Sequence, residues 1–176
     1  MDFKDKLSQT VRIINDFPVK GIIFRDITPI LKDIDLFNET IFIFADRFKD
    51  YKIDKITAIE SRGFLFGMPL AIKMKIPFVP IRKKGKLPAE TVQAAYALEY
   101  GAAIVELHKD ALNKGDRTLI IDDLLATGGT VNAGVELIER LGANPIAAAF
   151  VIELLDLSGR KSVKNKDVEV FSILQY

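Results

Sequence analysis

The sequence predicts an α/β fold, with a mainly parallel β-sheet flanked by helices, and three observations support this. Short runs rich in branched apolar residues alternate with segments in which apolar residues recur every three or four positions. The short runs are apolar almost throughout, which is typical of strands buried on both faces. The 176 residues contain no repeat, linker or low-complexity tract, so we expect one domain, residues 1–176, with a single core.

The helical pattern occurs four times. Apolar spacing from Phe3 to Ile14 predicts an amphipathic helix that ends before Pro18. The same spacing predicts helices over residues 37–48, 64–74 and 131–141. Strand-like runs cover residues 55–60, 77–82, 102–107, 117–122 and 145–154. Residues 83–95 have loop character without a clear period, which makes them a candidate mobile lid.

Charge and composition exclude several classes of function. Lys and Arg total 25 against 24 Asp and Glu, so the formal net charge of +1 gives no field suited to gripping a nucleic-acid duplex. The absence of cysteine excludes disulfides and thiolate metal sites and fits a reducing compartment. Residues 1–10 lack the apolar stretch of a secretion signal, and the longest apolar run, residues 146–152, is too short to span a membrane. We expect a cytoplasmic protein with neither nucleic acid nor membrane as a partner.

The segment that begins at the end of the strand at residues 117–122 has the features of an anion-binding loop. It reads Asp122-Asp-Leu-Leu-Ala-Thr-Gly-Gly-Thr130 and leads into a predicted helix. Gly128 and Gly129 would let backbone amides approach a phosphomonoester closely. Hydroxyl donors at Thr127 and Thr130, with the positive end of the helix, would add to the attraction. The lysine of a Walker loop and the G-x-G-x-x-G of a dinucleotide loop are both missing.

Two adjacent acids, Asp122 and Asp123, open this segment. Carboxylates do not bind phosphate directly, but they accept hydrogen bonds from paired hydroxyls and help to hold hydrated magnesium. Ribose hydroxyls beside a 5-phosphate would therefore satisfy both halves of the loop. The alternative is purely structural, with Asp and Thr capping the helix and the two glycines making a turn.

These nine residues, 122–130, resemble the motif by which type I phosphoribosyltransferases bind phosphoribosyl diphosphate (PRPP), in the form found in the adenine phosphoribosyltransferases. Three further segments support the closer match: Phe17-Pro-Val-Lys-Gly-Ile-Ile-Phe-Arg-Asp-Ile-Thr-Pro29, Glu60-Ser-Arg-Gly-Phe-Leu-Phe-Gly67, and Ile81-Arg-Lys-Lys-Gly-Lys-Leu-Pro88 continuing to Leu98-Glu-Tyr-Gly101. The resemblance covers nearly the entire chain. It implies purine salvage, in which 5-phosphoribosyl passes from PRPP to N9 of adenine and gives AMP and diphosphate.

The resemblance also implies an architecture and a set of ligands. About residues 1–34 plus the C-terminal segment would form a small base-binding hood, and about residues 82–101 a flexible catalytic lid. A homodimer is implied, with Mg²⁺ held mainly by PRPP and water and assisted by Asp122 and Asp123. The phosphate and ribose of PRPP or AMP would be bound by Asp122, Asp123, Ala126, Thr127, Gly128, Gly129 and Thr130.

By the same resemblance, diphosphate is bound by the loop after residues 55–60 and by the start of the lid. The residues that match are Ser61, Arg62, Arg82, Lys83 and Lys86, with one lid cation available to a neighbouring subunit. A cis peptide between Glu60 and Ser61 is also implied. Without the resemblance, a solvated charge run is the simpler interpretation of the lid cations.

The catalytic residues implied by the resemblance are Arg62, Arg82, Lys86, Glu99 and Tyr100. Cations would stabilise the departing diphosphate. Glu99 would either accept the N9 proton or stabilise the sugar cation, and Tyr100 would position the lid. The alternative for Glu99 is a surface carboxylate without a role.

Adenine would be bound by Ile23, Phe24, Arg25 and Leu154. Phe24 matches the stacking residue of the family and Leu154 the opposite wall, while the main chain near Ile23 and Arg25 would read the adenine edge. A base with a 6-oxo group would mismatch these partners. The alternative for Phe24 is simple core packing.

Two other functions stay open at this point. A sister phosphoribosyltransferase would act on hypoxanthine, guanine or xanthine and would differ only in the base it accepts. A regulator would bind PRPP without chemistry, usually with a DNA-binding segment, and no basic helix-turn-helix appendage is evident in this sequence. The lid residues that match the family also argue against a binding-only module.

Overall fold

The computed structural model describes residues 2–97 and 102–176. The chain order of its helices and strands is α1 (Phe3–Thr10), β1 (Arg12–Asn15), β2 (Ile23–Asp26), α2 (Thr28–Lys32), α3 (Ile34–Phe48), β3 (Lys55–Ile59), α4 (Arg62–Met74), β4 (Phe78–Lys83), β5 (Thr91–Ala97), β6 (Ala102–His108), β7 (Arg117–Leu125), α5 (Gly129–Arg140), β8 (Asn144–Glu153), the 3₁₀ helix η1 (Leu155–Leu157), α6 (Gly159–Ser162) and β9 (Glu169–Gln175). In the described part of the chain, no helix is both long and apolar enough to cross a membrane.

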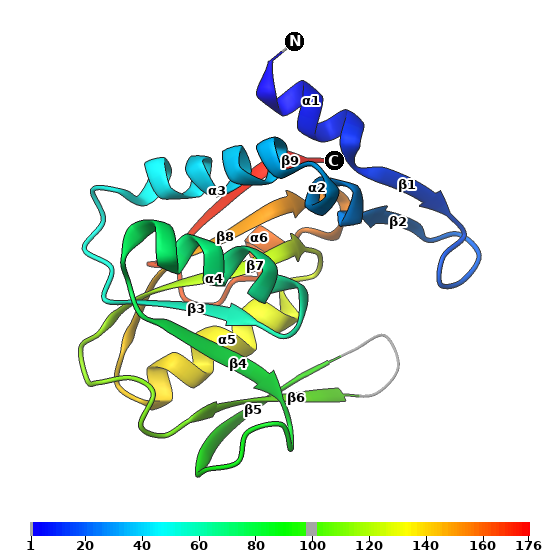
Figure 1. The fold of residues 1–176 in the computed structure, drawn as a ribbon. Helices are drawn as coiled ribbons and strands as arrows, with labels where there is room; N and C mark the ends of the chain where they lie inside the picture. Colours follow the sequence, from blue (N-terminus) through cyan, green and yellow to red (C-terminus); the bar gives the residue numbers. More distant parts are fainter. Residues whose placement is uncertain (1, 98–101) are drawn as a thin grey trace.

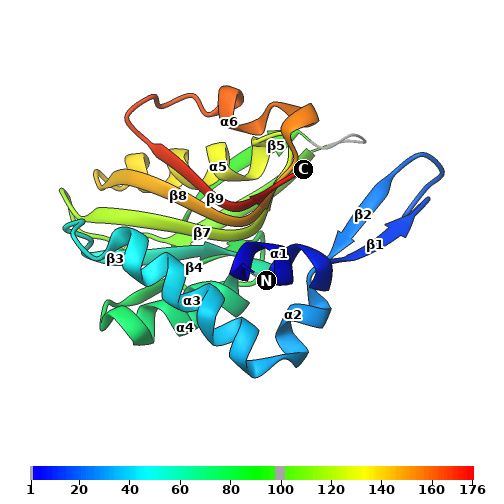
Figure 2. The same cartoon turned by 90° about the horizontal axis from the view of Figure 1, so that it is seen from above.

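Seven strands form the central sheet, in the order β5-β6-β4-β3-β7-β8-β9. The neighbours from β4 to β9 along this order are parallel, whereas β6 pairs antiparallel with both β4 and β5. The helices α3 and α4 cover one face and α5 the other (Figure 2). This arrangement confirms the predicted α/β fold with a mainly parallel sheet. The buried side chains form two clusters, one on each face, and not the single core we expected.

The sequence accounts for the helices that cover the sheet through a capping residue and through the spacing of their apolar residues. Asp33 caps α3, because its side chain accepts a hydrogen bond of 3.0 Å from the Leu36 amide. Phe44 and Phe48, four residues apart on the same helix, are fully buried against the sheet. On the other face, α5 buries Val131, Val135 and Ile138 at the same helical spacing. Together these helices bury both faces of the sheet.

The prediction for the N-terminal segment was partly wrong. The first helix ends at Thr10, and Ile14 lies in β1, which pairs antiparallel with β2 (Figure 1). The β-branched isoleucines of β1 favour an extended chain once β2 is beside them. The Phe17–Pro18 peptide in the connecting turn is cis. The resulting β1–β2 hairpin lies beyond the ends of the main sheet (Figure 2).

The segment expected to be an irregular lid contains a strand. Residues 91–97 form β5 and pair with β6 along their whole length, so the loop predicted over residues 83–95 is restricted to residues 84–90. Val92, Ala94 and Tyr96 alternate toward the apolar cluster on the α5 face, a period of two that two alanines partly hide in the sequence. The lid residues 98–101 lie outside the described residues.

The C-terminal segment joins the main sheet. Instead of belonging wholly to the hood, β9 pairs parallel with β8 as the edge strand. The residue after β9, Tyr176, contacts the β1–β2 hairpin, because the Arg25 guanidinium lies 4.0 Å from the centroid of the Tyr176 ring. The end of β9 thus connects the hairpin to the sheet.

Candidate active site

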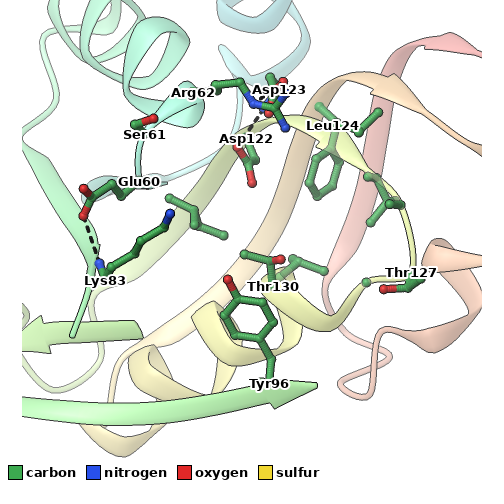
Figure 3. Close-up of a pocket in the computed structure, with 16 residues that line it drawn as sticks. Glu60, Ser61, Arg62, Lys83, Tyr96, Asp122, Asp123, Leu124, Thr127 and Thr130 are labelled. Carbon is green, nitrogen blue, oxygen red and sulfur yellow. Dashed lines mark hydrogen bonds and ion pairs between the residues drawn. The ribbon is translucent and has the colours of Figure 1, made fainter. Parts of the chain in front are cut away.

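A pocket of about 350 Å³ opens at the carboxyl ends of β3 and β7, where ligands of open α/β sheets bind (Figure 3). The residues that line it include Glu60, Ser61, Arg62, Lys83, Tyr96, Asp122, Asp123, Ala126, Thr127, Gly128 and Thr130. These residues come from four separate parts of the chain and are brought to one place. Most of them belong to the set predicted for PRPP.

The phosphate loop, residues 126–130, joins β7 to α5. Its N-cap residue, Gly128, has φ 85° and offers no side chain to cap the helix. The first backbone amides of the twelve-residue α5 consequently have no capping side chain. Thr127 and Thr130 line the same pocket, whereas Gly129 begins the helix. The geometry is that of a helix N-terminus prepared for an anion.

The two acids were predicted at the end of a strand over residues 117–122, but they lie within β7, which continues to Leu125. The Asp123 amide donates to Asp122 Oδ1 at 2.9 Å. Asp123 is 2% exposed, and its Oδ2 lies 3.1 Å from Arg62 Nε but accepts no hydrogen bond among the described residues. Burial and the negative charge of Asp123 raise the pKa of Asp122 well above its usual value. Burial also raises the pKa of Asp123, although Arg62 opposes this.

Arg62 is the cation beside this carboxylate pair, and Asp123 Oδ2 still has no hydrogen-bond donor among the described residues, so the pair suits paired hydroxyls or the shell of a hydrated cation. In the part of the chain that the structure describes, no group of three or more His, Cys, Asp or Glu could hold a metal ion. Asp122 and Asp123 would fit the hydration shell of a magnesium ion that is held mainly by its own ligand.

The start of α4 approaches β7 very closely at Gly63. A Cβ atom on Gly63 would lie 2.7 Å from the Ile121 carbonyl oxygen and 3.0 Å from Asp122 Oδ1. The absence of a side chain thus lets Ser61 and Arg62 reach the pocket beside the two acids. The Glu60–Ser61 peptide is cis, as the resemblance implied.

The lid cations do not all enter the pocket. Lys83 points into it (Figure 3), but Arg82 and Lys86 are not among the residues that line it. Arg82 instead pairs with Glu60, at 3.2 Å between Nε and Oε2, and donates from Nη1 to the Lys86 carbonyl at 3.0 Å. Burial alone would raise the pKa of Glu60, but the Lys83 amide and Arg82 outweigh it and hold the pKa below its usual value.

The residues predicted for adenine lie beside this pocket and not on its lining. Phe24 on β2 packs edge-on against Phe17, with ring centroids 5.2 Å apart. The Arg62 guanidinium lies 5.8 Å from the Phe24 ring centroid and so connects the hairpin to the pocket. Ile23 is 54% exposed, and the Leu154 amide donates to the Leu125 carbonyl at 2.9 Å. Glu99 and Tyr100 lie outside the described residues.

Sequence reasoning missed Tyr96 and the side chain of Glu60. Both line the pocket, and Tyr96 points toward Thr130 from β5 (Figure 3). The available signal for Tyr96 was its alternation with Ala94 and Val92, which indicates a strand facing the phosphate loop. No local signal marks Glu60, because its partners Arg82 and Lys83 are more than 20 residues away.

Comparison with known proteins identifies relatives of this chain. Residues 30–176 match the phosphoribosyl transferase domain family. The adenine phosphoribosyltransferase of Desulfosudis oleivorans is 48% identical over 170 residues, covering 97% of each chain. The crystal structure of adenine phosphoribosyltransferase from Thermoanaerobacter pseudethanolicus superposes with a TM-score of 0.94 at 47% identity, covering 98% of this chain and 99% of that one. The Saccharomyces cerevisiae enzyme, complexed with an iminoaltritol bisphosphate and adenine, gives a TM-score of 0.92 at 40% identity, covering 98% of both chains.

Proposed function

The chain belongs to the phosphoribosyltransferase family, alongside full-length adenine phosphoribosyltransferases, and from this premise we propose how its pocket performs their reaction. The enzyme transfers 5-phosphoribosyl from PRPP to N9 of adenine, in purine salvage. The bond between ribose C1 and the diphosphate oxygen breaks, the bond between C1 and N9 forms, and N9 loses its proton. The products are AMP and diphosphate.

The observation that carries the proposal is the junction of β7, the phosphate loop and α5. The uncapped amides at the start of α5, with Thr127 and Thr130, bind the 5-phosphate of PRPP or AMP. Asp122 and Asp123 accept hydrogen bonds from the ribose hydroxyls, since both acids line the pocket and Asp123 Oδ2 has no hydrogen-bond partner among the described residues. Backbone atoms of Ala126, Gly128 and Gly129 complete the phosphate site.

Diphosphate is held opposite this loop. Ser61 and Arg62 lie at the start of α4, and Lys83 reaches the same pocket from β4. Magnesium, when bound with PRPP, neutralises negative charge on the diphosphate. Arg62 and Lys83 add fixed positive charge where the leaving group develops negative charge, which lowers the barrier. Arg82 and Lys86 act from the turn beside Lys83, or on the site of a neighbouring subunit.

Adenine is bound between the β1–β2 hairpin and the end of β8. Phe24 stacks on the ring and Leu154 supplies the opposite wall. The main chain near Ile23 and Arg25 reads the edge of the base and discriminates against a 6-oxo group. Glu99 serves as the proton acceptor or stabilises the sugar cation, with Tyr100 positioning the lid.

We also propose a homodimer in the cytoplasm, and two exposed helix faces support the dimer. Large apolar side chains on α3 and α4 are open to solvent, with Phe42 54%, Met68 45% and Ile72 71% exposed. Such a patch is typical of a surface that meets a partner. Light scattering should give twice the mass of the chain, and Ile72→Asp should shift the population toward monomer. A monomeric parent protein at working concentration contradicts the dimer.

The experiment that tests the function is a diphosphate-release assay with magnesium and PRPP, offering adenine, hypoxanthine, guanine, xanthine and orotate separately. Release with adenine alone is expected, and it should stop when magnesium is chelated. Release with another base instead would keep the mechanism but assign a sister enzyme. Silence with all five bases, in a protein that still binds PRPP, would identify a regulator.

A further inference from the structure

A buried carboxylate outside the pocket organises the turn that carries the lid cations. Glu106 lies on β6 and is 3% exposed. Its Oε1 accepts hydrogen bonds from the backbone amides of Lys86 and Leu87, each at 3.0 Å. Its Oε2 lies 3.4 Å from both Thr91 Oγ1 and Gln93 Nε2. Glu106 is therefore satisfied chiefly by the turn between β4 and β5.

A second carboxylate holds the opposite end of this turn. Glu60 Oε2 accepts from the Lys83 amide at 2.9 Å and pairs with Arg82 at 3.2 Å. Arg82 also donates to the Lys86 carbonyl, which lies within the turn. Lys83, the last residue of β4, and the turn residues 84–87 are thus held between Glu60, directly after β3, and Glu106, on the antiparallel strand β6.

The burial of Glu106 favours the observed conformation of the turn over open conformations. A carboxylate removed from water is stable only where hydrogen-bond donors replace the water. Two of those donors are the Lys86 and Leu87 amides, so displacement of the turn would leave the charge of Glu106 without its main partners. The conformation in which Lys83 enters the pocket is consequently favoured over the many open conformations available to a turn containing Gly85.

We propose that Glu106 is a positioning residue for the transfer reaction, which holds the cation-bearing turn, residues 83–87, so that Lys83 meets the diphosphate. The inference rests on the proposed function, because that proposal places diphosphate beside Lys83. Glu106 touches no substrate itself. Its effect is specific to the diphosphate half of the pocket, since the phosphate loop and the hairpin do not depend on this turn.

The test compares Glu106→Ala, Glu106→Gln and Glu106→Asp in the reverse reaction, with KM measured for diphosphate and for AMP. Loss of two hydrogen bonds to a buried charge should raise the KM for diphosphate about tenfold or more in Glu106→Ala. The KM for AMP should stay within about twofold, because the phosphate loop is intact. Glu106→Gln keeps one acceptor for the two amides and should restore most of the diphosphate affinity.

Matched variants separate the outcomes. Glu90→Ala removes an exposed carboxylate of the same turn region, paired with Lys109 at 2.9 Å, and should leave both KM values unchanged. If Glu106→Ala does not fold, Glu106→Asp decides, because a side chain one methylene shorter cannot reach both amides. Equal changes in the KM for diphosphate and for AMP, or no change in either, overturn the inference.

A Lys83→Ala variant distinguishes failure of this inference from failure of the proposed function. If Lys83→Ala raises the KM for diphosphate and the Glu106 variants do not, only the positioning role is wrong. If Lys83→Ala also leaves that KM unchanged, diphosphate does not bind beside Lys83, and both proposals fail at this part of the pocket.

Discussion

The Nε atom of Arg62 lies 3.1 Å from Oδ2 of Asp123, an acid whose side chain is 3% exposed. The same guanidinium lies 5.8 Å from the ring centroid of Phe24. Arg62 therefore connects the acid proposed for ribose with the aromatic ring proposed for adenine, at the place where diphosphate would leave. Its charge also offsets part of the cost of burying Asp123.

Replacing Arg62 should affect catalysis more than folding. Arg62→Ala removes a cation from the leaving group and leaves Asp123 without its charge partner, so kcat/KM for PRPP should fall by about 10²-fold or more. Arg62→Lys keeps the charge but not the planar donor, and should recover only part of the loss. Steady-state kinetics with Lys109→Ala, an exposed ion-pair residue, gives the control. Activity of Arg62→Ala within about threefold of the parent would contradict the assignment.

The parallel sheet and its main helices were predictable because their apolar periods are local and strong. The β1–β2 hairpin was not, since the side chains of β1 are mostly exposed and its partner strand lies some residues further along the chain. Taken by itself, the spacing of Val11 and Ile14 fits a helix as well as it fits a strand. Only the pairing with β2 decides between the two structures.

Asp122→Asn should stabilise the protein while weakening its activity. Burial and Asp123 raise the folded-state pKa of Asp122, so the folded parent binds protons more tightly than the unfolded chain. Parent stability must then fall as pH rises from about 4, the ordinary aspartate value, through the raised pKa. The asparagine does not ionise, so its advantage in unfolding free energy should appear above about pH 4 and grow until the parent carboxyl is ionised.

Urea titrations of Asp122→Asn at several pH values would measure this advantage, with the exposed Asp46→Asn as the control. The affinity for PRPP with magnesium should fall in the same variant, because an amide accepts weaker hydrogen bonds from ribose and carries no charge. A variant that is less stable than the parent at neutral pH would show that the carboxylate is satisfied in the folded protein. Unchanged affinity for PRPP would remove Asp122 from the ribose site.

Much of the candidate site was predictable because residues 122–130 are nine consecutive residues whose chemistry can be deduced in order. The lid cations illustrate the limit. Sequence places Arg82, Lys83 and Lys86 together, but tertiary pairing with Glu60 withdraws Arg82 from the pocket. The contacts between Glu106 and the same turn are equally hard to predict from sequence. β5 lies between the turn and β6 along the chain, so these contacts follow only from the pairing of the strands.

The ion pair of Glu153 and Arg160 should stabilise the folded protein and also support Leu154, the residue proposed as one wall of the adenine site. Glu153 is 2% exposed, and its Oε1 accepts from Arg160 Nε at 2.9 Å, one residue before Leu154. Burial alone would raise the pKa of Glu153, but hydrogen bonds from Arg160 and Ser172 outweigh it and lower the pKa. The stabilisation is thus present above the ordinary glutamate value, near 4.3, and is lost as pH falls through the lowered pKa.

Arg160→Ala leaves this buried carboxylate without its cation and should cost about 2 to 3 kcal/mol of unfolding free energy, somewhat less than a fully buried pair because Arg160 is partly exposed. Denaturant unfolding checks this value, with the neighbouring exposed Lys161→Ala as control. The KM for adenine should rise as well, since Leu154 loses its support. A normal KM for adenine in a destabilised Arg160→Ala protein would limit the pair to a structural role.

Gly128→Ala tests the phosphate loop itself. The residue has φ 85°, and an added Cβ would lie 2.0 Å from Ser162 Oγ and 2.8 Å from the Gly159 carbonyl oxygen. The left-handed backbone alone costs about 1 to 2 kcal/mol for an alanine. The crowding against α6 must in addition displace the loop, so affinity for AMP should fall about tenfold or more while affinity for adenine changes little.

Gly115→Ala supplies the control for Gly128→Ala, because Gly115 has φ 90° with nothing within 4 Å of the added Cβ. It carries the backbone strain without the crowding and should lose stability but keep its affinity for AMP. Removal of the Ser162 hydroxyl in Gly128→Ala/Ser162→Ala relieves the closest contact and should recover part of that affinity. If the double variant binds AMP no better than Gly128→Ala, contact with the Ser162 hydroxyl is not what displaces the loop, and backbone strain and the Gly159 carbonyl oxygen account for the loss.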